Sequence, residues 1–79
     1  MSKKVKVALQ KNLMTGRYDC VKYTTNEIIT YLTSGERFNL IDGSQVISGR
    51  IEHGGHDYYW VSDSGGLKKE LHDNVVGFI

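Results

Sequence analysis

The chain of 79 residues contains no proline, one cysteine and no long apolar run. A single cysteine cannot form an internal disulfide, so we expect the protein in a reducing cytoplasm. No apolar run approaches the roughly 20 residues that a membrane-spanning helix needs. The lysines near the amino terminus are not followed by the apolar segment of a signal peptide. These absences predict a cytoplasmic protein that does not bind a membrane.

Neither sign of charge predominates, since ten basic and nine acidic residues give a formal net charge of +1. So small a charge argues against strongly electrostatic binding of nucleic acid and against an acidic mimic of DNA. The chain has no linker, internal repeat or low-complexity stretch. We therefore expect residues 1–79 to form one domain with a thin core, because a domain of this size buries only about 60% of its unfolded surface.

Short segments of β-forming residues, separated by glycine-containing turns, follow one another along most of the chain. Alternating apolar and polar residues predict a half-buried strand over 3–10, with 17–23 as its antiparallel partner. Further strands are predicted over 36–41, 45–53, 57–62, 67–71 and 75–79. This all-β or β-rich pattern of about five to seven short strands favours a small, partly open SH3-like barrel, and an oligonucleotide-binding barrel is the second choice.

Residues 24–34 fit two interpretations, a helix or a strand. Thr24 and Glu27 are spaced as in a helix capping box, and Gly35 stands where a helix could end. Against a helix, six of the eleven residues are threonine or isoleucine, whose branched side chains disfavour it. We predict one short helix over 25–33.

The stretch from Gly49 to Asp63 contains three of the eight aromatic residues of the chain. Two runs rich in β-forming residues flank Gly54 and Gly55, as in a β-hairpin. Glycine suits such a turn because tight hairpin turns require backbone dihedrals at positive φ. We predict that this hairpin is the central element of the fold.

Two registers of the hairpin are possible, and they differ in the residue pairs that each one creates. A two-residue loop would pair Glu52 with Asp57, and like charges directly opposite each other are unfavourable. A three-residue loop would place Arg50 opposite Trp60 on the outer face, where the guanidinium can stack on the ring, and would turn Tyr59 inward. The second register is therefore preferred.

In this register the outer face of the hairpin is the predicted binding site. It would consist of Arg50, Tyr58 and Trp60, with His53 and His56 beside them. Arg, Tyr and Trp are the residue types that most often anchor protein interfaces. The alternative, in which all three rings of the hairpin belong to the core, remains open, because so small a domain needs large apolar side chains.

The remaining reactive residues do not assemble into a recognisable catalytic pattern. His53, His56 and Asp57 have a spacing that could share a metal ion, but we expect two polar ends of a hairpin and no metal. Cys20 lies in a strand pattern and is expected to be a buried, inert thiol. No paired carboxylates, no nucleophile with a base and no cofactor loop are found, so we expect neither an enzyme nor a cofactor.

Basic residues are concentrated at the amino terminus. Lys3, Lys4, Lys6 and Lys11 give the first twelve residues a charge of +4, and the other six basic and nine acidic residues give −3. We interpret these lysines as the protection of an edge strand against aggregation. The alternative is a small nucleic-acid-binding barrel, in which Lys4 and Lys6 contact the backbone and exposed rings stack on bases.

Four short motifs stand out: Arg17-Tyr18, Leu-Thr-Ser-Gly-Glu from Leu32, Gly-Arg-Ile-Glu-His from Gly49, and Tyr58-Tyr59. Together they resemble a family of short uncharacterised proteins from Gram-positive bacteria and their phages or mobile elements. The resemblance covers roughly residues 17–79, without the first strand, and implies a setting in a host cell but no activity. With the predicted hairpin face, it leads us to expect a non-enzymatic module that binds a host or rival protein. An anti-CRISPR-like inhibitor of a defence complex is one form of such a module.

Overall fold

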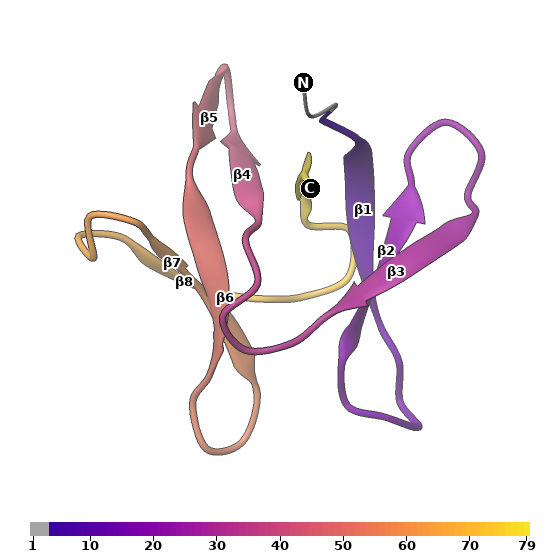
Figure 1. The fold of residues 1–79 in the computed structure, drawn as a ribbon, viewed down its shortest axis with the longest axis horizontal. Helices are drawn as coiled ribbons and strands as arrows, with labels where there is room; N and C mark the ends of the chain where they lie inside the picture. Colours follow the sequence, from indigo (N-terminus) through magenta and orange to yellow (C-terminus); the bar gives the residue numbers. More distant parts are fainter. Residues whose placement is uncertain (1–3) are drawn as a thin grey trace.

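The computed structural model describes residues 4–79, which form nine β-strands and no helix (Figure 1). Lys3, where the first predicted strand begins, lies outside the described residues. The strands are β1 (Lys6–Lys11), β2 (Tyr18–Lys22), β3 (Ile28–Leu32), β4 (Asn39–Asp42), β5 (Gln45–Ile47), β6 (Gly49–His53), β7 (Tyr58–Ser62), β8 (Lys68–Glu70) and β9 (Val76–Phe78).

The strands form two antiparallel sheets. The larger sheet has six strands in the order β3-β2-β1-β9-β4-β5, and the smaller has the order β6-β7-β8. In Figure 1 the β2–β3 hairpin lies on the right and the smaller sheet on the left, with the carboxyl terminus between them. The predicted all-β class is confirmed, and the two sheets are not closed into a barrel.

The predicted helix over 25–33 is wrong, because Ile28–Leu32 forms the edge strand β3. The branched threonine and isoleucine side chains fit a strand better than a helix. The residues with capping-box spacing lie instead in the turn between β2 and β3. In this turn Asn26 has a φ of 60°, and the backbone N–H of Lys22 donates to the carbonyl of Glu27 at 2.7 Å.

The predicted strand over 45–53 is two strands separated by Ser48. β5 continues the six-stranded sheet, whereas β6 begins the three-stranded sheet. The chain therefore crosses from one sheet to the other at this residue. This crossing and the additional strand β3 explain why the structure has nine strands, more than the five to seven predicted. The predicted antiparallel pairing of the first two strands is confirmed.

One hydrophobic core joins the two sheets. Its largest fully buried side chains are Trp60, Phe38, Leu9 and Ile51, which come from both sheets and from the segment before β4. Phe38 packs directly on the backbone of β9, where a Cβ added to Gly77 would lie 2.5 Å from the ring. The glycine is thus required by close packing between β9 and the core.

Candidate functional site

The β6–β7 hairpin has a register that differs from the predicted one. His53 pairs with Tyr58, so the loop consists of residues 54–57, and Ile51 pairs with Trp60. Gly55 adopts a φ of 85° in this loop. Because directly opposite residues share one face of a sheet, Trp60 points inward with Ile51, and both are 0% exposed. The predicted outward position of Trp60 is therefore wrong.

Trp60 is held inside the core by a hydrogen bond and by close packing. Its indole Nε1 donates to the carbonyl oxygen of Phe38 at 2.7 Å. A Cβ added to Gly49, on the neighbouring strand, would lie 2.3 Å from the same nitrogen. Trp60 consequently belongs to the core, as in the alternative left open for the rings of the hairpin.

The other residues of the predicted hairpin face do not form one surface. Arg50 is bonded to Glu52 at 2.9 Å on the outer face. Tyr58 lies on the inner side, where it packs against the core, and its ring centroid is 4.7 Å from that of His53. Tyr59, predicted to point inward, is opposite Glu52 on the outer face.

The histidines and Asp57 at the tip of the hairpin are not arranged as a metal site. Over residues 4–79, no group of three His, Cys, Asp or Glu side chains is placed to hold a metal ion. His53 and His56 are exposed, and Asp57 is engaged with Lys11 from the other sheet. The tip of the hairpin is thus tied to β1.

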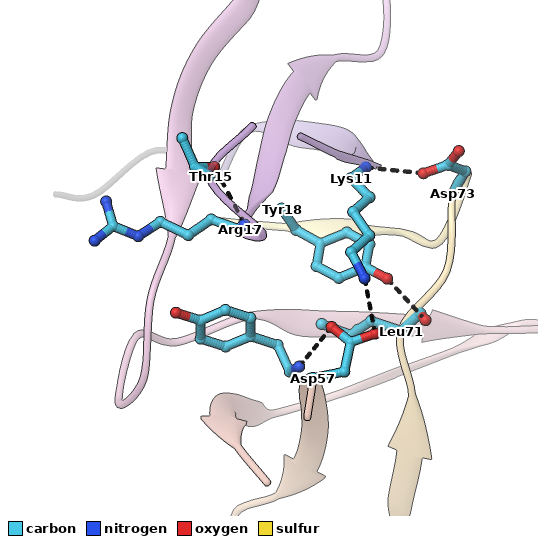
Figure 2. Close-up of polar contacts among 8 residues, drawn as sticks. Lys11, Thr15, Arg17, Tyr18, Asp57, Leu71 and Asp73 are labelled. Atoms are coloured by element: carbon cyan, nitrogen blue, oxygen red, sulfur yellow. Dashed lines mark hydrogen bonds and ion pairs between the residues drawn. The ribbon is translucent and has the colours of Figure 1, made fainter. Parts of the chain in front are cut away.

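Figure 2 shows how this contact links the two sheets. Lys11 Nζ lies 3.0 Å from Asp57 Oδ2, and the Lys11 backbone N–H donates to Asp73 at 2.8 Å. Beside them the hydroxyl of Tyr18 donates to the carbonyl of Leu71 at 3.0 Å. The Lys11 contact was not predicted from the sequence, because its two residues lie 46 positions apart, one in β1 and the other in the loop between β6 and β7.

Both charged groups of this contact are held in their ionised forms. The hydrogen bond to Asp57 raises the pKa of Lys11, against a smaller opposing effect of burial. The same hydrogen bond, together with one from the Tyr58 backbone N–H, lowers the pKa of Asp57. Burial raises the pKa of the Tyr18 phenol. A fixed ion pair of this kind suits a structural link better than proton transfer, which requires a group that changes its charge near neutral pH.

Cys20 lies in the core at 0% exposure, as predicted from its strand pattern. Burial raises the pKa of its thiol to about 12, with a smaller contribution from Glu36. The thiol is therefore protonated at neutral pH, and the reactive thiolate form is rare.

A different group of exposed residues lies on the face of the six-stranded sheet that points away from the core. The register places Val21 opposite Ile28 and Asp19 opposite Tyr31. Val21 is only 4% exposed yet is not part of the core cluster, so it lies beneath this outer face. Around it are Tyr23, Ile28 and Tyr31, whose exposed fractions are 52%, 63% and 48%.

Each tyrosine of this face carries a cation above its ring. Lys6 Nζ lies 4.2 Å from the centroid of the Tyr23 ring, and the guanidinium carbon of Arg17 lies 5.1 Å from that of Tyr31. We call these five residues, Lys6, Arg17, Tyr23, Ile28 and Tyr31, the β2–β3 face. Of the two lysines predicted for nucleic-acid binding, Lys6 belongs to this face, while Lys4 is exposed ahead of β1. Cation–π contacts at exposed sites contribute about 0.5–1 kcal/mol each.

The sequence does indicate this face, but not when residues 25–33 are interpreted as a helix. Once residues 28–32 are read as a strand, Tyr31 falls on the opposite side from the core residue Leu32. The sequence also placed Arg17 and Tyr23 at the two ends of the preceding predicted strand. The aromatic hairpin holds more rings in one stretch of sequence than these residues do, so ring density along the chain does not indicate this face.

Two shallow grooves lie elsewhere on the molecule. One, of about 280 Å³, lies where the two sheets meet and is lined by Leu40, Trp60, Leu71 and Val75 among others. The other, of about 230 Å³, lies beside the hairpin tip and includes Tyr59 and Lys68, whose ammonium group lies 4.2 Å from the Tyr59 ring. Asp57 also lines the second groove, and its carboxylate is already bonded to Lys11.

The part of the chain described here has no helix with the length and apolar character that crossing a membrane requires. Comparison with curated proteins and with solved structures found no match. A family model described as a domain of unknown function matches residues 8–76, which includes the end of β1 that the resemblance in sequence left out. Membership of an uncharacterised family is thus confirmed, while the bacterial and phage setting stays a prediction. The chain belongs to the DUF5348 family, a domain of unknown function.

Proposed function

We propose that this protein is a non-enzymatic module that binds another protein through the β2–β3 face. The observation that carries the proposal is the exposure of Tyr23, Ile28 and Tyr31 around Val21 on one face of the six-stranded sheet. A small domain gains stability by burying such side chains, so their grouping outside the core calls for another explanation. Apolar patches on a soluble protein often mark interaction sites.

The residue types of this face and their arrangement on the sheet suit a protein interface. Tyrosine and arginine are enriched at the energetic centres of protein interfaces. Here Lys6 and Arg17 lie above the two rings, and Ile28 and Tyr31 belong to a strand of the six-stranded sheet. A partner would therefore find a largely preformed surface, which reduces the entropy lost on binding.

The resemblance to proteins of phages and mobile elements suggests the kind of partner. We propose a host or rival protein, for instance a component of a defence complex that the module occupies and inhibits. The hairpin residues Arg50 and Tyr58 are less suited to contact this partner, since Arg50 is paired with Glu52 and Tyr58 packs on the core.

Nucleic-acid binding is kept as the second candidate because of one specific feature, the ammonium of Lys6 above an exposed tyrosine. Rings beside cations on a sheet can stack on unpaired bases while the cations contact phosphates. Asp19, opposite Tyr31 in the register, and the net charge of +1 make this candidate weaker. Salt separates the two, because affinity for nucleic acid falls steeply between about 50 and 200 mM salt.

The proposal is tested by capture from a lysate of the natural host with tagged wild-type protein and with Tyr31→Ala. The matched control is Val46→Ala, since Val46 is 51% exposed but lies on β5 at the far edge of the sheet. We expect mass spectrometry to identify a protein that the wild type and the control retain and Tyr31→Ala loses. Equal capture by all three would refute the proposal, and salt-sensitive capture of nucleic acid alone would favour the second candidate.

A further inference from the structure

We propose that β3 pairs with β3 of a second copy of the chain, antiparallel, so that two six-stranded sheets join edge to edge in a symmetric dimer. This inference does not depend on the proposed function. It follows from a comparison of the sheet edges, which carry backbone groups that can pair with another chain unless something prevents it.

Three of the four sheet edges are protected. β5 and β8 have only three residues each, and β8 consists of charged residues, Lys68, Lys69 and Glu70. Very short and charged edge strands are common devices against pairing with other chains. These two edges offer little to a second copy.

The edge of β6 is covered by the chain itself. Residues 35–38 run alongside it and bond to its backbone. Ile51 N–H donates to the carbonyl of Glu36 at 2.8 Å, and the carbonyl of Gly49 accepts from Phe38 N–H at 3.1 Å. This edge is therefore satisfied within one molecule.

The fourth edge, β3, lacks most of these protections. It has five residues, Ile-Ile-Thr-Tyr-Leu, and among residues 4–79 only β2 pairs with it, on one side. Residues 28–34 include no charge and no proline. One irregularity is present, a register shift that leaves Ile29 without a partner in β2, whereas Thr30 to Leu32 pair in regular order. The regular part remains available to a further strand.

The chemistry of this regular part fits its own copy. With a two-fold axis at Tyr31, Thr30 lies opposite Leu32 of the other copy, and the two Tyr31 rings lie opposite each other. Cross-strand aromatic pairs are favourable, and in this register no two like charges are opposed. Because this edge is uncharged, it contains no charged side chain that would repel the same edge of a second copy.

Joining at the edge leaves Tyr23 and Ile28 of the β2–β3 face free, while Tyr31 lies beside its own copy at the junction. Strand pairing uses backbone groups in the plane of the sheet, while Tyr23 and Ile28 project from its face. The dimer would bring two such faces into one continuous surface. A single pair of short strands is a small interface, of the size found in weak complexes, so we expect a dimer whose population depends on protein concentration.

The test is sedimentation velocity over a concentration series, with the 8.9 kDa mass of one chain as the reference. The wild type should approach twice this mass. Thr30→Lys and Thr30→Glu should each weaken self-association by about five-fold or more, because each variant sets a charge opposite Leu32 of the other copy and makes two like charges diagonal neighbours across the junction. An equal mixture of the two should regain the dimer. Thr30 is exposed, so both variants are expected to fold, and Val46→Lys on β5 is the matched control.

A crosslink tests the register independently. In oxidising conditions Tyr31→Cys should form a disulfide-linked dimer, since opposite residues of paired strands lie within disulfide range and the native Cys20 is buried. A wild type that stays at one-chain mass at every concentration would overturn the proposal. A dimer that persists in both Thr30 variants, or no dimer in their mixture, would also overturn it. Each result is obtained with the purified protein and is independent of the proposed partner.

Discussion

The packing of Trp60 against Gly49 makes a prediction that a double-mutant cycle can test. Trp60 is fully buried, and its replacement by leucine removes most of the ring and the hydrogen bond to the Phe38 carbonyl. Loss of the bond to a buried carbonyl costs about 1–3 kcal/mol, and truncation of a large core side chain adds the cost of a cavity. We expect Trp60→Leu to reduce the free energy of unfolding by about 3 kcal/mol.

Gly49→Ala acts on the same space from the opposite strand. Its backbone φ lies outside the left-handed region, but the new Cβ would lie 2.3 Å from the indole nitrogen of Trp60. Overpacking of this kind costs about 1–3 kcal/mol. In a chain that already carries Trp60→Leu the obstructing atoms are absent, so most of this cost should disappear. The double variant should therefore be more stable than the sum of the single effects predicts, by about 1 kcal/mol or more.

The assay is urea unfolding followed by far-ultraviolet circular dichroism, because Trp60 is the only tryptophan and its fluorescence is lost in two of the variants. A domain of 79 residues has a free energy of unfolding of about 4–12 kcal/mol, which leaves room to measure the single variants. Single effects that add within about 0.5 kcal/mol would show that residue 49 and the indole do not meet, and would refute the observed register of the hairpin.

Three further predictions follow from the ionisable groups and the outer ring of the hairpin. The lowered pKa of Asp57 means that its contact with Lys11 stabilises the fold above the unfolded pKa and is lost as pH falls through the folded one. Asp57→Asn should accordingly lower stability at neutral pH and reduce the acid sensitivity of thermal melts, and an unchanged pH profile would contradict this. Cys20, with its pKa near 12, should react with a thiol reagent far more slowly in native than in urea-unfolded protein, and equal rates would place it at the surface. Tyr59→Ala, on the outer face under Lys68, should cost only about 1 kcal/mol in urea unfolding, and a loss as large as that of Trp60→Leu would show that the ring belongs to the core.

Most strands were predictable from the sequence because their signals are local. Alternation identified β1, and glycine-containing turns such as Asp42-Gly43 separated β4 from β5. The error over 25–33 was also local, since capping-box spacing outweighed the branched side chains of Ile28 and Ile29. The spacing of Thr24 and Glu27 does not distinguish a helix from a turn, because a turn with Asn26 at positive φ contains both residues. The threonine and isoleucine content of the segment is the better guide here.

The register of the central hairpin was not predictable by the same reasoning. Loops of two and three residues were compared, and the loop has four, from Gly54 to Asp57. A change of one residue in register moves every side chain of a strand to the other face, so Trp60 and Tyr59 exchanged places. The Lys11–Asp57 contact, which fixes this loop against β1, is a long-range effect of the fold.

The exchange of the two rings also bears on where the proposed binding surface lies. A domain of this size needs a large ring in its core, and Trp60 fills that need at the junction of the two sheets. Tyr23 and Tyr31 lie on the side of the six-stranded sheet that faces away from the core, around the buried Val21. Because their hydroxyls and the cations above them favour a surface that is wet on one side, these rings suit contact with a partner better than burial. The proposed binding surface is therefore indicated by which face of the sheet each aromatic residue lies on. The density of aromatic residues along the chain does not indicate it.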